Sequence, residues 1–345
     1  MNTTKVILDI DNAIGMPVRD VDDGIALALA LASPEIELLG VTTCAGNCRT
    51  RESTENTLRL LEMAGRSDIP VAEGRELPFL QDVTANFELL EGFSKMYGFL
   101  WEDVPPLPPV TINPSPLPAH EFIIKMVREN PGEVVIVKEG SHTNLALALL
   151  VDPEIAPLVK SVLHMGGETG QPDWKTPDLT SNRADPDVWQ YIIKMNHTYD
   201  PEATSIVVRS GIPFTFVTGE VCKRTLLRRE HIDRIMAVGT PYHEFLANTS
   251  RPWVTWQVEY RGYGGEKPLR DGAPMWDPLT LALSFDPSLC SYVSMRCDTE
   301  AFRNRKYPYL YPSADTPQVQ VTMDVDEKRF EELMVSRICD YLAIR

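Results

Sequence analysis

The sequence lacks the features of a secreted or membrane-spanning protein. No stretch of its 345 residues approaches the roughly 18 consecutive apolar residues of a membrane span, and Asp9 interrupts the first apolar run before any leader core could form. The six cysteines include no CxxC pair and no histidine partners at zinc-site spacing, which favours buried free thiols in a reducing compartment. We therefore expect a soluble, cytoplasmic protein.

Positive charge is also scarce. Lys and Arg number 33 against 49 Asp and Glu, so the formal net charge is -16, and the acidity is spread along the chain. Such a surface disfavours binding to nucleic acid or to anionic membranes and makes metal cations natural partners of local acidic clusters. The 43% of hydrophobic residues suffices for a large core, and we expect a single domain over residues 1–345.

Apolar runs alternate with helical patterns along the first two-thirds of the chain. The run at 5–10 is followed by a helical pattern that begins near Asp22, and the run at 36–47 by one at 54–65. Continuous apolar runs are typical of buried parallel strands, and this alternation predicts right-handed crossovers within one sheet. The predicted fold class is α/β, Rossmann-like, with a mainly parallel central sheet and flanking helices.

Two segments break this rhythm. Residues 77–118 are rich in proline and aromatic side chains, and residues 170–190 are polar but include Trp174 and Trp189. Long insertions in a compact domain are often functional, and aromatic side chains argue against disorder. We expect each insertion to be either a lid or a packed decoration.

Five aspartates crowd the fifteen positions from Asp9 to Asp23. Asp9 and Asp11 come where the first predicted strand ends, and parallel sheets collect ligands at the carboxyl ends of their strands. Asp22 and Asp23 precede a helical run, where the helix dipole favours negative charge. One alternative is that Asp22 caps the helix and Asp11 shapes a turn. Hard oxygen ligands without His or Cys indicate calcium or magnesium.

The strand followed by DxD also resembles the haloacid-dehalogenase-like phosphotransferases. Their pattern has Thr or Val two residues past the second Asp, where this sequence has Ala13. That resemblance leaves the second motif, "DVDDG", without a role. A phosphohydrolase is therefore the runner-up interpretation.

The complete set of motifs resembles the inosine-uridine-preferring nucleoside hydrolases, in which a strand ends in DxD and a paired DD opens a small-residue helix. Here "NAIGMPVRDV" separates the two motifs, as in the longer-loop branch of that family. The resemblance continues in order through "PEIELLGVTTCAGN", "TNLALAL", "LHMGG", "NHTYDPEA" and "WDPLTLAL", over roughly residues 5–287. It implies the nucleoside hydrolase fold and hydrolysis of an N-glycosidic bond.

The resemblance also implies roles for particular residues. Calcium would be bound by the side chains of Asp11, Asp23 and Asp277 and by the backbone carbonyl of Glu139, and would retain a water as nucleophile with Asp11 as its base. Ribose would be bound by Asp22, Asn47 and Asn196. Taken alone, Asp277 reads as a helix N-cap and Asn196 as a turn residue.

The sequence departs from the family pattern at two positions. Trp276 stands where pyrimidine-tolerant members carry His, which favours a purine stacked on the indole, although Trp276 is equally interpretable as core. Lys194 stands where the family usually has a Glu that contacts ribose. If Lys194 faces the substrate, it would pair with an anionic or modified sugar; otherwise it lies in solvent.

We therefore predict a calcium-dependent enzyme that splits a ribonucleoside or a related ribosyl compound into free base and ribose. The non-enzyme alternative is a family relative that binds metal and ligand without turnover. A small nucleoside-like molecule is the expected partner, and by analogy with the family a homodimer or homotetramer is possible.

Overall fold

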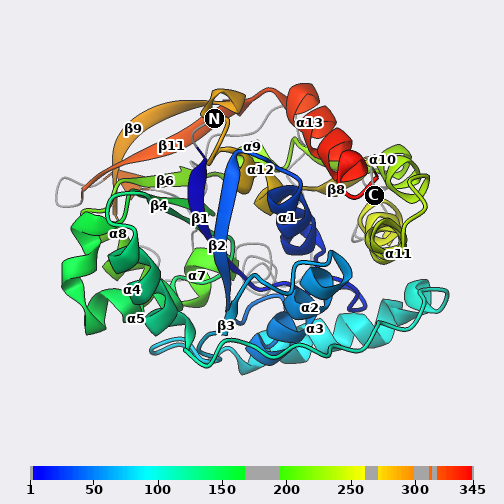
Figure 1. Cartoon of the computed structure of the whole chain (residues 1–345), viewed down its shortest axis with the longest axis horizontal. Coiled ribbons are helices and arrows are strands. Elements are labelled where there is room, and N and C mark those ends of the chain that lie inside the picture. Colours follow the sequence, from blue (N-terminus) through cyan, green and yellow to red (C-terminus); the bar gives the residue numbers. More distant parts are fainter. Residues whose placement is uncertain (1–2, 168–194, 261–270, 299–310, 313–316, 344–345) are drawn as a thin grey trace.

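The computed structural model describes residues 3–167, 195–260, 271–298, 311–312 and 317–343 (Figure 1). Over these residues a nine-stranded sheet runs in the order β10-β9-β11-β6-β5-β4-β1-β2-β3, and a two-stranded antiparallel sheet joins β7 to β8. In this spatial order the seven strands from β11 to β3 pair in parallel. Strand β9 pairs antiparallel with β11, and β10 pairs antiparallel with β9. The predicted fold class is confirmed.

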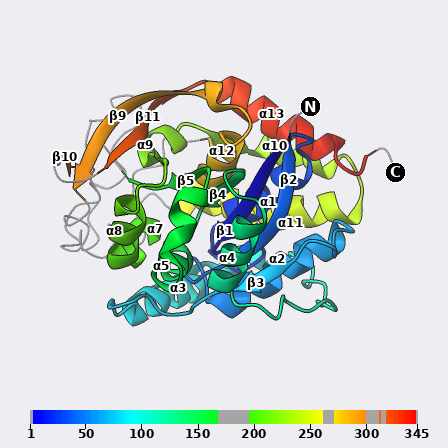
Figure 2. The ribbon, with the colours of Figure 1, turned by 60° about the vertical axis from the view of Figure 1, so that its left-hand side comes forward.

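The strands of both sheets are short to medium in length. They are β1 (Thr4–Ile10), β2 (Ile36–Thr43), β3 (Val71–Glu73), β4 (Val134–Lys138), β5 (Ser161–Met165), β6 (Phe214–Val217), β7 (Leu226–Arg228), β8 (Gly272–Pro274), β9 (Cys290–Asp298), β10 (Tyr311–Pro312) and β11 (Gln318–Val325). Figure 2 shows β9 and β11 running side by side at one end of the large sheet.

Most helices follow a strand and pack back against the sheet. The α-helices are α1 (Asp22–Leu31), α2 (Thr50–Met63), α3 (Thr84–Tyr97), α4 (Ala119–Glu129), α5 (Thr143–Val151), α7 (Met195–Tyr199), α8 (Pro201–Arg209), α9 (Gly219–Cys222), α10 (Arg229–Met236), α11 (Pro241–Thr255), α12 (Trp276–Ala282) and α13 (Glu327–Asp340). Short 3-10 or π turns are η1 (Gly98–Trp101), η2 (Pro153–Leu158), η4 (Trp256–Tyr260) and η5 (Pro287–Leu289). Among the described residues, no helix combines the length and apolarity needed to cross a bilayer.

Each face of the sheet has its own hydrophobic core. Along β1, Val6, Leu8 and Ile10 pack into a core shared with α1, α11, α12 and α13, whereas Ile7 packs into a core shared with α4, α5 and α8. This alternation follows from the period of two along a strand. Because both faces are covered, the strand is apolar throughout, as its sequence predicted.

Helix α1 lies close to the loop that leads into it. A Cβ at Gly24 would fall 2.9 Å from Cβ of Ile14, so a glycine is needed where this loop passes over the helix. The rest of α1 consists almost entirely of Ile, Leu and Ala, which favour a helix and are buried here. Tight packing of this helix fixes the position of its first turn, which carries Asp22 and Asp23.

The segment 77–118 is packed onto the protein and is only partly loop. It contains α3, whose buried side chains are Asn86, Phe87 and Leu90. The guanidinium of Arg19 donates to the carbonyl of Leu90 at 2.6 Å and to the hydroxyl of Ser94 at 2.8 Å. These contacts attach α3 to the loop between β1 and α1. The second predicted insertion, 170–190, lies outside the described residues.

Candidate active site

The candidate site lies at the carboxyl edge of the large sheet, where β1 sits between β2 and β4. From β1 the sheet extends through β2 and β3 on one side and through β4, β5 and β6 on the other. The strand order therefore reverses direction between β1 and β4, and parallel sheets bind ligands at such a switch point. The predicted site residues that reach this edge from β1, β2, β4, α1 and α12 are Asp11, Asn47, Glu139, Asp22, Asp23 and Asp277.

Three carboxylates from two helices converge there. Asp22 and Asp23 open α1, Asp277 lies in the first turn of α12, and each offers one oxygen within 4.8 Å of the others. All three residues are buried. Helices α1 and α12 pack against each other, so residues more than 250 positions apart meet at this point.

Asp11 joins this cluster through the backbone and through Asn47. The amide N–H of Asp11 donates to Oδ1 of Asp23 at 3.0 Å, and the amide N–H of Asn47 donates to Oδ2 of Asp11 at 2.6 Å. The side-chain amide of Asn47 also donates to Oδ2 of Asp23 at 3.4 Å. A Cβ at Gly46 would fall 1.9 Å from Oδ2 of Asp11, so only glycine allows this loop to approach the carboxylate.

Helix capping does not account for these aspartates. The N-cap of α1 is Val21 and that of α12 is Met275, and neither makes a side-chain capping bond. Asp22 and Asp277 both lie inside the first turn of their helices. The capping alternative for these two residues is therefore wrong, and Asn196 lies in α7 rather than in a turn.

The cluster concentrates negative charge in a buried place. Burial, followed by the charges of neighbouring carboxylates, raises the pKa of Asp22, Asp23 and Asp277 well above the usual range. Burial also raises the pKa of Asp11 to about 7, although hydrogen bonding from Asn47 opposes that rise. Oδ1 of Asp11 and Oδ1 of Asp22 are buried and accept no hydrogen bond within the described part of the chain. Oxygens of this kind need a cation or protons, and they fit a hard divalent metal ion.

Asp9, the first aspartate of the DxD motif, has a different role. Its carboxylate forms an ion pair with Lys138, and both side chains are fully buried. It also accepts hydrogen bonds from the hydroxyl of Thr42 at 2.8 Å and the amide of Asn144 at 3.1 Å. Sequence reasoning missed Lys138, although a charged residue at the end of the apolar run "VVIVK" was the available signal. Asp9 is a structural residue that joins β1, β2 and β4.

Replacing Lys138 by Met is expected to destabilise the protein by about 3–5 kcal/mol, because Asp9 would remain as an uncompensated buried charge. Chemical denaturation measures this difference. In the double variant Lys138→Met with Asp9→Asn most of the loss should be recovered. Equal stability of the single variant and the unmodified protein would show that the pair does not matter.

Asn196 contacts the ends of two neighbouring strands. Its side-chain amide donates to the carbonyl of Glu139 at 2.6 Å and to that of Met165 at 3.2 Å. Trp276 is partly buried against the core that includes α1 and α12, and its carbonyl accepts from the hydroxyl of Thr280. Lys194 lies outside the described residues.

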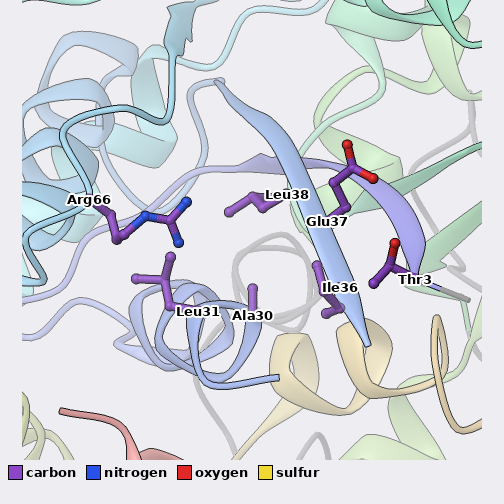
Figure 3. Close-up of a pocket in the computed structure, with 7 residues that line it drawn as sticks. All are labelled: Thr3, Ala30, Leu31, Ile36, Glu37, Leu38 and Arg66. Carbon is purple, nitrogen blue, oxygen red and sulfur yellow. The ribbon is translucent and has the colours of Figure 1, made fainter. Parts of the chain in front are cut away.

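A cavity of about 420 Å³ lies away from this site. It is lined at the start of β2 by Ile36, Glu37 and Leu38, and Figure 3 shows Arg66 projecting toward it from another segment. The guanidinium of Arg66 is already bonded to both carboxylate oxygens of Asp68 at 2.9 Å. The cavity lies at the amino end of its strand, opposite the aspartate cluster, and contributes no group to that site.

A Rossmann-like sheet with buried carboxylates at its switch point defines an α/β protein suited to bind a cation and a small polar ligand together. The profile of the inosine-uridine preferring nucleoside hydrolase family matches residues 6–332. The chain therefore belongs to this family, and it is an N-ribohydrolase that acts on N-glycosyl compounds. The resemblance predicted from the sequence is confirmed.

Relatives and solved structures agree with this assignment. The chain is 31% identical to the pyrimidine-specific ribonucleoside hydrolase RihA of Enterobacter sp. (strain 638) over 93% of this chain and 95% of the relative. A purine-preferring ribonucleoside hydrolase from Gardnerella vaginalis superposes with a TM-score of 0.78 at 25% identity, covering 99% of this chain and 100% of the other. A plant nucleoside hydrolase gives a TM-score of 0.74 at 27% identity, covering 98% and 99%.

Proposed function

We propose that this N-ribohydrolase cleaves ribonucleosides at the carboxylate cluster and that the cleavage depends on a calcium ion. The observation that carries the proposal is the convergence of buried carboxylates from β1, α1 and α12, with oxygens of Asp11 and Asp22 left without hydrogen bonds in the described structure. The absence of His and Cys from that set favours calcium over transition metals.

The side chains divide into ligands and substrate contacts. Asp11, Asp23 and Asp277 would bind the ion, together with an oxygen of Glu139. A bound divalent cation supplies positive charge that offsets the carboxylates and lowers the pKa of a water molecule. Asp11 is the proposed base that takes the proton of the attacking water.

The remaining polar groups would orient the sugar. Asp22 is the proposed acceptor of hydrogen bonds from the ribose hydroxyls, and Asn47 and Asn196 are the other proposed ribose contacts. Breaking the N-ribosidic bond develops positive charge on the sugar ring, and nearby carboxylates stabilise that charge. Lys194 is a further proposed contact, in which case an anionic or modified sugar would be favoured.

A product assay tests the proposed function. Metal-stripped protein is supplied with calcium or with chelator and offered a panel of purine and pyrimidine ribonucleosides, and released base and reducing sugar are measured. We expect release with calcium and little release with chelator. Undiminished turnover in the presence of chelator would contradict the calcium dependence and leave the hydrolase assignment intact.

Trp276 is the proposed determinant of base preference. If the indole stacks on the base, purines should be cleaved faster than pyrimidines, because a larger ring gains more from stacking. Trp276→Phe should then lower the purine-to-pyrimidine ratio of kcat/KM by about 3-fold to 10-fold, on the order of 1 kcal/mol of ring contact. A change in melting temperature with an unaltered ratio would show that Trp276 only packs the core.

A further inference from the structure

Glu139 is an acidic residue placed beside the carboxylate cluster at the end of β4. Its amide N–H donates to the carbonyl of Asp9 at 2.8 Å, which holds the residue against the end of β1, two positions before Asp11. Its exposed fraction is 1%. The side chain is therefore enclosed in the protein at the edge of the sheet where the site lies.

The side-chain carboxylate of Glu139 has no hydrogen-bonding partner in the described part of the chain. Both Oε1 and Oε2 are buried, and neither accepts a bond there. The adjacent ammonium of Lys138 is bonded to Asp9 and to the carbonyl of Ser141. Leaving an ionised carboxylate buried without a partner is very costly, so this group needs a cation or a proton.

The charges nearest to the Glu139 carboxylate are those of aspartates, which do not neutralise it. Burial raises the pKa of its carboxyl well above the usual range, and the charges that raise it further are first those of Asp23 and Asp22, then that of Asp11. Conversely, the charge of Glu139 helps to raise the pKa of Asp277. The carboxylate thus shares its electrostatic environment with all four aspartates of the cluster.

The backbone carbonyl of Glu139 is already engaged. It accepts the side-chain amide of Asn196 at 2.6 Å, one of the shorter hydrogen bonds at this edge. The side-chain oxygens are free of such bonds, whereas the carbonyl is not. The carbonyl therefore keeps one lone pair at most for a metal ion, whereas both carboxylate oxygens are wholly unused.

We propose that the side-chain carboxylate of Glu139 is itself a ligand of the cation, beside the carboxylates of Asp11, Asp23 and Asp277. This inference rests on the proposed metal-dependent function, and it assigns the side-chain carboxylate of Glu139 to the ion in place of its backbone carbonyl. Together with the neighbouring Asp22, which is the proposed sugar contact, these carboxylates carry more negative charge than one divalent ion neutralises. The site should therefore bind a trivalent lanthanide more tightly than calcium, because hard oxygen ligands of high charge favour the more highly charged ion.

The test measures ion binding directly and needs no substrate. Metal-stripped full-length protein is titrated with calcium and with terbium by calorimetry. Glu139→Gln keeps the backbone carbonyl and the size of the side chain but removes its charge. We expect calcium affinity to fall by more than about 10-fold, because mutating even a residue that only hydrogen-bonds to a metal ligand typically lowers metal affinity by about that factor. The wild-type protein should bind terbium more tightly than calcium.

Glu331→Gln is the matched control. Glu331 is also a buried glutamate, but it binds Arg228 and the amide of Leu226 away from the cluster. Its replacement should leave calcium affinity unchanged. If Glu139→Gln fails to fold, Glu139→Asp shortens the ligand and keeps the charge, and it should weaken calcium binding to an intermediate degree.

The possible results separate the two proposals. Unchanged calcium affinity in Glu139→Gln, or in Glu139→Asp where that variant replaces it, would overturn the carboxylate ligand and leave the carbonyl as the contact, with the proposed function intact. A wild-type protein that takes up neither ion would overturn both the ligand and the metal dependence.

Discussion

Stripped of divalent ions, the protein is expected to lose stability as the pH rises from about 4 to 8, and calcium is expected to restore part of that stability. The pKa of Asp11 gives the direction of this change in stability with pH. Its carboxyl has an ordinary pKa of 3.8, which burial raises to about 7 in the folded protein. Between these values the folded state binds more protons than the unfolded state, so stability is fully present below 3.8 and is lost as the pH rises through about 7.

The expected loss of folding stability is large for a single site. For Asp11 alone the loss is on the order of 4 kcal/mol, from about three pKa units at 1.36 kcal/mol each. Asp22, Asp23, Asp277 and Glu139 add to it in the same direction, because burial raises the pKa of each. A bound cation replaces the missing protons, so it should stabilise the folded state most at high pH.

Two buried histidines act in the opposite direction. Burial lowers the pKa of His142 and His164 well below 6.5, so their contribution to stability is lost as the pH falls below about 6.5. A pH series alone would mix the two effects. The difference between calcium and chelator isolates the carboxylates, because neither histidine belongs to the proposed ligand set.

The measurement is chemical denaturation at pH 5, 6, 7 and 8 with calcium or with chelator. At a fixed calcium concentration the stabilisation should grow with pH, and it amounts to about 2.7 kcal/mol at a pH where free calcium is 100 times its dissociation constant. Asp23→Ala is the control and should show no calcium-dependent change at any pH. A stabilisation that is absent, or the same at every pH, would contradict the assignment of these carboxylates to a cation site.

Much of the fold could be predicted from the sequence because local pattern determines it. The apolar run that forms β1 and the Leu and Ala repeat of α1 each have one compatible structure in a covered parallel sheet. The strand expected within 36–47 and the helix expected at 54–65 are likewise present as β2 and α2. The segment 77–118 was harder, because its prolines suggested loop while the stretch that forms α3 contains none.

The parts of the site that could not be predicted depend on contacts between distant residues. Asp9 and Asp11 look equivalent in "DID", yet the register of β1 with β4 places Asp9 opposite Lys138 and leaves Asp11 beyond the strand. The residues next to Asp9 in the sequence do not indicate that it pairs with Lys138, which lies 129 positions away. Similarly, the choice between capping and clustering at Asp22 depends on α12, which only tertiary packing brings near.

The bond from Asn196 to the carbonyl of Glu139 is another contact of this kind. Reasoning by position assigned the carbonyl to the metal and Asn196 to the sugar. In the folded chain the two groups bind each other at 2.6 Å. A matched sequence position names Glu139 but does not say whether its backbone carbonyl or its side-chain carboxylate binds the ion. That question arises only from the hydrogen bonds in the folded structure.

Asp11→Asn is expected to lower kcat by about 100-fold to 10,000-fold at saturating calcium, the range for loss of a general base. The amide keeps an oxygen at the position where the backbone N–H of Asn47 now donates at 2.6 Å, so the fold of the loop should be preserved. It cannot take a proton. The acid limb of the pH profile, which reports the base, should therefore disappear along with the rate.

Calorimetry on the same variant separates chemistry from ion binding. Calcium affinity is expected to fall, because a neutral oxygen replaces a charged one, so rates must be compared with the site saturated. Glu331→Gln, which alters a buried acid away from the site, should keep both kcat and the pH profile. If Asp11→Asn with bound calcium turns over within about threefold of the wild type, Asp11 is a ligand only and another group must accept the proton.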